Sequence, residues 1–123
     1  MSEHAISWFA IPVVDLERAR AFYSTLFDIT MPDLVTPGGT CAVFPQMQTG
    51  VSGSLNPFMG FKPSADSGVT IWLNAGDDLQ VPLDRVEGAG GKVLQPKEQI
   101  GEFGHIAMIL DTEGNRIGLH SPN

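Results

Sequence analysis

The sequence contains a single cysteine, Cys41, among its 123 residues, so no disulfide can form within the chain. We expect this thiol to be buried in a strand of a protein of the reducing cytoplasm. No apolar run approaches the roughly 18 residues that a membrane span requires, and no basic and apolar leader opens the chain. The sequence therefore predicts neither a membrane span nor secretion.

Basic residues are also scarce. Seven Lys and Arg residues stand against 14 Asp and Glu residues, which gives a net charge of -7. This charge would repel the phosphates of a nucleic acid and disfavours such a partner, whereas a neutral or cationic small molecule fits it better. Apolar residues make up 42% of the chain and charged residues 17%, as is typical of one packed domain.

The first half of the chain combines apolar strand segments with one helix. Residues 4–14 are apolar and rich in β-branched and aromatic side chains, which predicts a strand. Asp15 is suited to cap a helix, and apolar residues recur at helical spacing over residues 16–27. Turns rich in proline and glycine separate further short strands, which we predict over residues 29–35, 40–44 and 50–55.

The second half repeats this order. Its strand, helix and three further strands are predicted over residues 68–74, 79–87, 92–96, 105–110 and 116–120. Pro82 belongs in a first turn, so a helix start nearer Val81 is an alternative. The last two strands form a hairpin around the turn 111–115, where Gly114 supplies the positive φ that a short loop needs.

The two helix entries, Asp15 and Asp78, are 63 residues apart. We expect an α+β fold of two βαβββ modules, residues 4–56 and 68–121, joined by a linker over residues 57–67. One such half cannot bury both faces of its sheet. Two halves side by side, with the helices outside, would form a curved eight-stranded mixed sheet whose concave cup is the predicted ligand site.

Two stretches carry a family resemblance, IPVVDLERARAFYSTLF in the first half and GGKVLQPKEQIGEFGHIAMILDTEGNRIGLHS in the second. They resemble the vicinal oxygen chelate superfamily, which contains glyoxalase I, bleomycin-resistance proteins and extradiol dioxygenases. The second stretch looks like small members described only as related to lactoylglutathione lyase. The resemblance implies the paired βαβββ fold, a divalent metal in the cup held by His or Glu ligands, and a homodimer.

The metal-ligand positions that the resemblance implies lack suitable side chains in this sequence. They fall on Trp8 in the first strand, on Val69 at the start of the second half and on Gly118 in the last strand. A further ligand is expected in the first hairpin, but residues 44–61 contain no Asp, Glu, His or Cys. We therefore expect no metal cofactor at the usual site, so that relatives binding a ligand in a bare cup become the closer comparison.

Strand alternation then predicts which side chains face the cup. Thr70 and Trp72 are expected to face away from it, and Leu73 to face in. An apolar cup suits a small aromatic or aliphatic ligand, and an indole can stack on a ring or a cation. The predicted ligand-binding residues are Trp8, Val69, Ile71, Met108, Gly118 and His120.

His120 has two interpretations, a structural one and a role in the pocket as an acid, a base or a ligand anchor. Glu102 is its best candidate partner in catalysis, although a solvated loop acid is the simpler interpretation. His105 has the opposite strand parity, which disfavours a metal site shared with His120. Besides a small-molecule-binding protein, the alternatives are a lyase or isomerase of the glyoxalase I type, using a non-standard metal site or these two residues, and a non-catalytic interaction or regulatory protein.

Overall fold

The computed structural model describes residues 5–45, 51–58, 60 and 62–123. His4 and Gly50, at the predicted starts of two strands, lie outside these residues. No helix in the described part is long and apolar enough to cross a membrane. The elements are β1 (Trp8–Pro12), α1 (Leu16–Phe27), β2 (Asp33–Thr36), β3 (Gly39–Val43), β4 (Ser52–Asn56), β5 (Trp72–Asn74), α2 (Gln80–Leu83), β6 (Lys92–Gln99), a 3-10 turn (Gly101–Phe103), β7 (His105–Leu110) and β8 (Arg116–Ser121).

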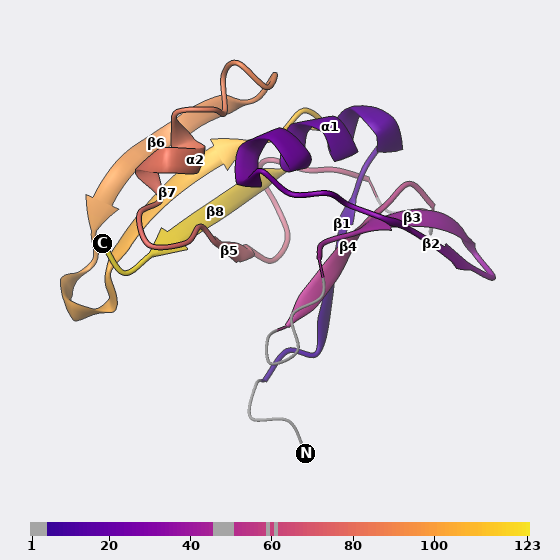
Figure 1. Cartoon of the computed structure of the whole chain (residues 1–123), viewed down its shortest axis with the longest axis horizontal. Helices are drawn as coiled ribbons and strands as arrows, with labels where there is room; N and C mark the ends of the chain where they lie inside the picture. Colours follow the sequence, from indigo (N-terminus) through magenta and orange to yellow (C-terminus); the bar gives the residue numbers. More distant parts are fainter. Residues whose placement is uncertain (1–4, 46–50, 59, 61) are drawn as a thin grey trace.

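The eight strands form two four-stranded sheets, one from each half of the chain (Figure 1). The strand orders are β1-β4-β3-β2 and β5-β8-β7-β6. In each half the first strand runs parallel to the last, and the other neighbours are antiparallel. The α+β class and the two βαβββ modules are thus confirmed, with the strands divided between two sheets.

Helix α1 has the predicted bounds. The Asp15 side chain accepts a hydrogen bond from the Arg18 amide at 3.1 Å, which satisfies one free donor of the first turn. The helix ends where Asp28 adopts a left-handed conformation with φ 53°. Its buried face consists of Ala19, Phe22, Tyr23 and Leu26, which follow the helical period.

Helix α2 covers only Gln80–Leu83, so the predicted helix over residues 79–87 is wrong in length. Its entry is as expected, because the Asp78 carboxylate accepts a hydrogen bond from the Gln80 amide at 2.9 Å. Pro82 removes one backbone donor, and three glycines over residues 88–91 disfavour helix. The apolar spacing that suggested a longer helix is instead met by consecutive turns.

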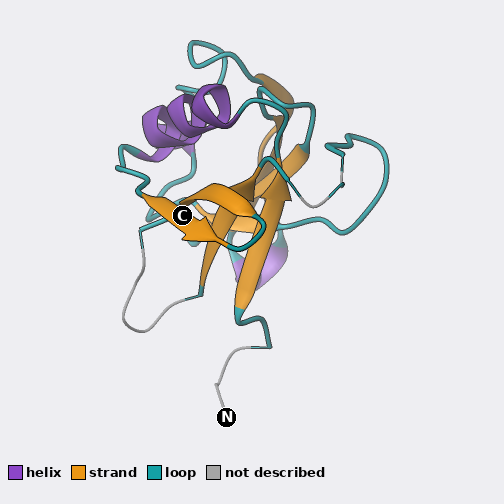
Figure 2. Ribbon diagram, turned by 90° about the vertical axis from the view of Figure 1, so that its right-hand side faces the viewer, coloured by secondary structure: helices purple, strands orange, loops and turns teal. Residues whose placement is uncertain are grey.

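Both halves contribute to one hydrophobic core. Helix α1 lies above the strands of both sheets (Figures 1 and 2). Buried side chains from one face of each sheet pack beneath it. These are Ile11, Ala42 and Leu55 from the first sheet and Leu73, Ala107, Ile109, Ile117 and Leu119 from the second.

The turn between β7 and β8 joins the second half to α1 and β1. Asp111 and Asn115 are buried. Asp111 Oδ2 accepts a hydrogen bond from the Tyr23 hydroxyl at 2.6 Å, and Asn115 Nδ2 donates to the Pro12 carbonyl at 2.8 Å. Burial, with the nearby Asp111 charge, raises the pKa of Tyr23 well above its ordinary value. The hairpin turn predicted from the sequence therefore also connects the second module to the first.

Glu113 of the same turn binds the start of α1. Its Oε1 accepts hydrogen bonds from the amides of Val14 and Asp15, both at 2.8 Å, and its Oε2 accepts one from Arg18 Nε at 2.7 Å. Burial alone would raise the pKa of Glu113. The hydrogen bonds from Arg18, the two amides and the Thr112 hydroxyl outweigh it and lower that pKa to about 2.

The predicted cup is not formed by the two halves of one chain. The core-facing sides of both sheets meet in the shared core, so their other faces point outward. Trp8 and Trp72 lie on these outer faces, with 42% and 45% of their surface exposed. Strand alternation predicts which residues share a face, but it does not predict how one sheet is turned relative to the other.

Candidate functional site

Trp8 and Trp72 occupy equivalent places in the two halves. They are 64 residues apart, as are Leu16 and Gln80, the first residues of the two helices. Trp8 lies on β1, and its indole Nε1 donates a hydrogen bond to Ser54 Oγ at 3.1 Å. Trp72 lies on β5 opposite Gly118 of β8. The repeat offset is thus 64 residues, where the helix entries had suggested 63.

The predicted orientation of the fifth strand is wrong. Leu73 pairs with Leu119 and is buried in the core, and Trp72 lies over Gly118 on the outer face. Both faces of this three-residue strand carry apolar residues, so the sequence does not reveal its parity. Ile71 consequently packs against the core, and Val69 precedes the strand with 92% of its surface exposed.

The outer side of Gly118 is covered by Trp72. A Cβ at this position would collide with the indole ring of Trp72. Met108 pairs with Gly118, and His120 pairs with Ile106, as the hairpin register predicts. Met108, Gly118 and His120 therefore share the outer face with Trp72, while Trp8 belongs to the outer face of the other sheet.

The residues at the family's metal-ligand positions do not fit a divalent ion. Of the implied positions, Trp8 lies in β1 and Gly118 in β8, with Ser54 and Trp72 as their respective neighbours, while Val69 precedes β5. Zinc and related ions prefer imidazole, thiolate or carboxylate ligands, which none of these five residues supplies. Within the described ranges, no group of three or more His, Cys, Asp or Glu side chains is placed to hold a metal.

The predicted acid–base pair is not assembled. His120 Nε2 lies 2.7 Å from the Phe103 carbonyl oxygen, so the 3-10 turn that contains Glu102 does approach His120. The Glu102 side chain is exposed, and no hydrogen bond joins it to His120. This geometry holds the imidazole through the backbone next to Glu102, which agrees with the structural interpretation of His120.

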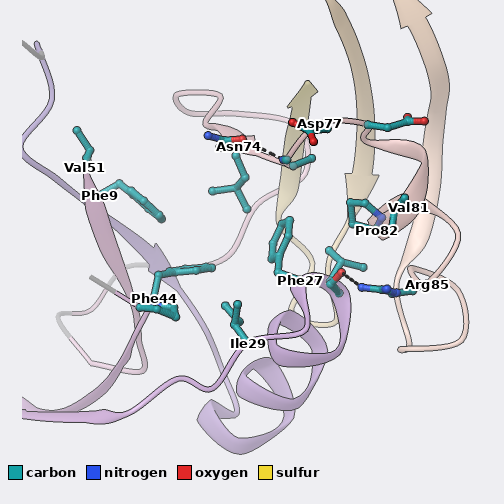
Figure 3. Close-up of a pocket in the computed structure, with 16 residues that line it drawn as sticks. Phe9, Phe27, Ile29, Phe44, Val51, Asn74, Asp77, Val81, Pro82 and Arg85 are labelled. Carbon is teal, nitrogen blue, oxygen red and sulfur yellow. Dashed lines mark hydrogen bonds between the residues drawn. The ribbon is translucent and has the colours of Figure 1, made fainter. Parts of the chain in front are cut away.

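A cavity of about 620 Å³ lies between the two sheets, beside the C-terminal end of α1 (Figure 3). Phe9, Phe27 and Phe44 supply aromatic surface, and Leu73 and Ala75 face them from the second half. The other lining residues are Leu26, Ile29, Pro45, Val51, Asn74, Gly76, Asp77, Asp78, Val81, Pro82 and Arg85. The cavity is thus an unfilled part of the space that the two modules share.

Polar groups lie at one side of this cavity. Arg85 Nη1 donates to the Leu26 carbonyl at 3.1 Å, and Asn74 Oδ1 accepts from the Gly76 amide at 3.0 Å. The Asp78 carboxylate accepts from Lys97 Nζ at 2.8 Å, and this contact lowers its pKa. The Asp77 carboxylate has no hydrogen-bond partner among the described residues, which leaves it available to a ligand.

Strand patterns alone did not identify this cavity. Phe9 alternates with Trp8 along β1, so it lies on the opposite face of this strand and packs against the core. The sequence does not show that Phe9, Phe27 and Phe44 leave a space facing Leu73 and Ala75 of the other half, because this space depends on how the two modules pack.

Residues 5–119 match the family described as Glyoxalase/Bleomycin resistance protein/Dioxygenase superfamily. A protein of Mycobacterium tuberculosis with the provisional name glyoxylase CFP32 is 31% identical over 120 residues. The alignment covers 95% of this chain but 45% of the mycobacterial protein, so this chain spans less than half of that relative. A glyoxylase-like domain-containing protein of Didymella fabae is also 31% identical, with 89% of this chain and 88% of that protein covered.

Solved structures share the fold. A glyoxalase/bleomycin resistance protein from Streptomyces sp. CB03234 superposes with a TM-score of 0.73 at 24% identity, covering 93% of this chain and 97% of that one. TnmS3, an antibiotic binding protein from the same organism, gives 0.71 at 23% identity, with 100% and 99% covered. The sequence match and the paired βαβββ modules agree, and the chain belongs to the Glyoxalase/Bleomycin resistance protein/Dioxygenase superfamily.

Proposed function

We propose that this protein binds a small, largely apolar organic molecule in the cavity between its two sheets. The observation that carries this proposal is the cavity of about 620 Å³, which is lined by Phe9 of β1, Phe27 of α1 and Phe44 directly after β3. Aromatic walls favour a flat or aliphatic ligand through burial and ring contacts. The similarity to an antibiotic binding protein supports small-molecule binding only at this general level.

The polar side of the cavity narrows the class of ligand. Asp77 is an unpaired carboxylate at the edge, and the whole chain carries a net charge of -7. An amine or hydroxyl donor on the ligand would bond this carboxylate, while an anionic group would be repelled. We therefore favour a neutral or cationic molecule with one donor group.

A thermal-shift screen with small aromatic and aliphatic amines, alcohols and acids tests this proposal. A ligand present at about 100 times its Kd adds about 2.7 kcal/mol to the unfolding free energy, which such a screen detects. Hits that bind this cavity, identified by the loss of their shift in the Val81→Glu variant below, should be amines or alcohols. Acids that bind this same cavity equally well would contradict the assigned role of Asp77.

Val81 provides the site-specific variant, because it lines the cavity and is 54% exposed. Val81→Glu should abolish the shift caused by a neutral hit, since it places a charge against the apolar wall. Val35→Glu makes the same change on the exposed β2 edge, away from the cavity, and should leave the shift intact. Equal thermal shifts in both variants would mean that the ligand binds to another surface.

The outer faces of the two sheets, which carry Trp8 and Trp72, are the second candidate site. They bear on whether the protein pairs with a second copy of itself. Trp8 and Trp72 are half exposed on strands β1 and β5, which belong to two different sheets of one chain. A second copy related by a two-fold axis would bring Trp8 of each protomer toward Trp72 of the other. We propose that a homodimer completes the cup in this way.

Sedimentation velocity tests this arrangement. Wild-type protein should sediment as a dimer, and Trp72→Arg should sediment as a monomer. The Val35→Arg control places the same charge on an exposed residue of β2 and should remain dimeric. A monomeric wild type across the micromolar range would contradict the shared cup.

The enzymatic alternative depends on His120 and Glu102 or on a non-standard metal site. The hydrogen bond of His120 to the Phe103 carbonyl disfavours the first. Metal analysis of the purified protein decides the second, and a tightly bound stoichiometric ion would favour the lyase or isomerase interpretation. A screen without any hit would instead favour the interaction or regulatory role.

A further inference from the structure

A second, smaller cavity of about 260 Å³ lies between the end of β1, the start of β8 and the segment that joins the two halves. It shares no lining residue with the cavity between the sheets. One side is apolar and one side is polar. The lining residues are Ala10, Ile11, Pro12, Lys62, Ser64, Ser67, Gly68, Val69, Ile71, Asn115, Arg116 and Ile117.

The charge of this cavity is opposite to that of the molecule. Lys62 and Arg116 line it, and no Asp or Glu is among its lining residues. The chain has only seven Lys and Arg residues against 14 acids. In the described ranges Arg18, Arg20 and Lys97 are ion-paired, but neither Lys62 nor Arg116 is.

The guanidinium of Arg116 is only partly satisfied. Its Nη2 donates to Thr70 Oγ1 at 3.1 Å, and its Nε is buried with no hydrogen-bond acceptor in the described structure. A buried charged donor without an acceptor is costly and calls for an explanation such as a bound anion. A guanidinium binds a carboxylate with particular strength because two of its N–H groups can bond both oxygens.

Neighbouring hydroxyl groups extend the polar wall. Ser64 Oγ and Ser67 Oγ lie 3.0 Å apart, and the Ser64 amide is held by Asn115 Oδ1 at 3.3 Å. Asp66 accepts a hydrogen bond from Ser64 Oγ at 3.0 Å, but it is exposed and outside the cavity lining. The serine hydroxyls are therefore positioned as additional donors or acceptors beside Arg116.

We infer that this cavity binds a small organic carboxylate, with its carboxylate on Arg116 and Lys62 and its apolar part against the isoleucine and proline wall. Its volume corresponds to about eight or nine water molecules at roughly 30 Å³ each, which limits the ligand to a single small ring or short chain. Inorganic phosphate would satisfy the cations but leave the apolar wall in contact with water.

Benzoate is the probe, and benzamide is its uncharged counterpart of the same shape. We follow the Arg116 Nε–H signal and the backbone amides of residues 67–71 and 115–117 by heteronuclear NMR at constant ionic strength. Benzoate should cause saturable shifts at these signals, and benzamide should not. Benzamide binding as tightly as benzoate, or phosphate binding as tightly, would overturn the assignment to an organic carboxylate.

Two variants test whether Arg116 and Lys62 form the site. Arg116→Gln should weaken the affinity for benzoate at least tenfold. Lys62→Gln should weaken it at least threefold, and this exposed change leaves the fold intact. Lys92→Gln removes an exposed charge of β6 outside both cavities and should stay within twofold of wild type. An equal loss of benzoate affinity in Lys92→Gln and Lys62→Gln would mean that only the overall charge matters. The absence of a saturable benzoate shift in the wild type would rule out the site.

Discussion

At the scale of single residues, the indole of Trp72 and the missing side chain of Gly118 form one unit. The ring lies where a Cβ of residue 118 would project from β8. A side chain at this position and the ring at its present place exclude each other. The outer face of the second sheet therefore carries an aromatic surface at a position that the family resemblance assigns to a metal ligand.

Gly118→Ala should lower the unfolding free energy by about 1–3 kcal/mol, because the methyl group overpacks a filled space. Urea unfolding measures this cost. Gly88→Ala is the control, since a Cβ there meets only the Arg85 carbonyl at 3.9 Å. In a Trp72→Ala background the cost at residue 118 should fall, and an unchanged cost would mean that the ring is not what the alanine meets.

Glu113 gives the protein a specific dependence on acid. Its folded pKa of about 2 lies below the ordinary value of 4.5, so its ionised form is preferred in the folded state. The resulting stabilisation is fully present above about pH 4.5 and is lost as the pH falls toward 2. At 1.36 kcal/mol per pH unit, its upper bound is roughly 3 kcal/mol.

Glu113→Gln should reduce stability at pH 7 and flatten the fall in stability between pH 4.5 and pH 2. Chemical unfolding across this pH range measures both effects. Glu17→Gln makes the same change on α1 at a side chain that is 78% exposed, and it should follow the wild-type curve. A wild-type acid profile in Glu113→Gln would show that other carboxylates govern the transition.

At the scale of elements, α1 was predictable and its counterpart was not. Asp15, the helical period and Asp28 lie close together in sequence and agree on both ends of α1. In the second half, apolar spacing suggests nine helical residues, but Pro82 and the glycines of residues 88–91 allow only four. β5 shows the related limit, because three residues with apolar side chains on both faces do not define a parity.

The contact between α1 and the β7–β8 turn supports another prediction. Tyr23→Phe removes the hydroxyl that donates to Asp111 and should lower the unfolding free energy by about 1–3 kcal/mol. The effect should shrink in an Asp111→Asn background, because the two side chains share one hydrogen bond. If the losses of unfolding free energy in the two variants were fully additive in urea unfolding, this hydrogen bond would not be what connects α1 to the turn.

At the scale of the whole molecule, the shared core predicts that both halves unfold together. The chain has two tryptophans, and each half contains one of them. Trp72→Phe leaves Trp8 as the reporter of the first half, and Trp8→Phe leaves Trp72 for the second. Fluorescence unfolding curves of each variant should coincide with its circular dichroism curve, whereas separate transitions would mean that the halves are independent domains.

The relative placement of the halves was the part of the fold that the sequence did not reveal. Alternation along β1 correctly assigns Trp8 and Ile11 to opposite faces, because it depends only on neighbouring residues. Which face meets the other half depends on contacts between residues far apart in sequence, such as Asn115 and Pro12, which are 103 residues apart. The apolar character of a ligand cavity was predictable, but its walls were not.

The packing of Trp72 on Gly118 also constrains how a metal centre could be engineered into this scaffold. A combinatorial library that varies residue 118 alone would sample only variants in which the new side chain competes with the indole. A glutamate there requires a side chain smaller than tryptophan at residue 72, and histidine at residues 72 and 8 would meet this requirement while adding ligands from the first strands. Directed evolution toward metal-dependent chemistry therefore has to begin with coupled changes at both positions, because no single-step route passes through well-packed intermediates.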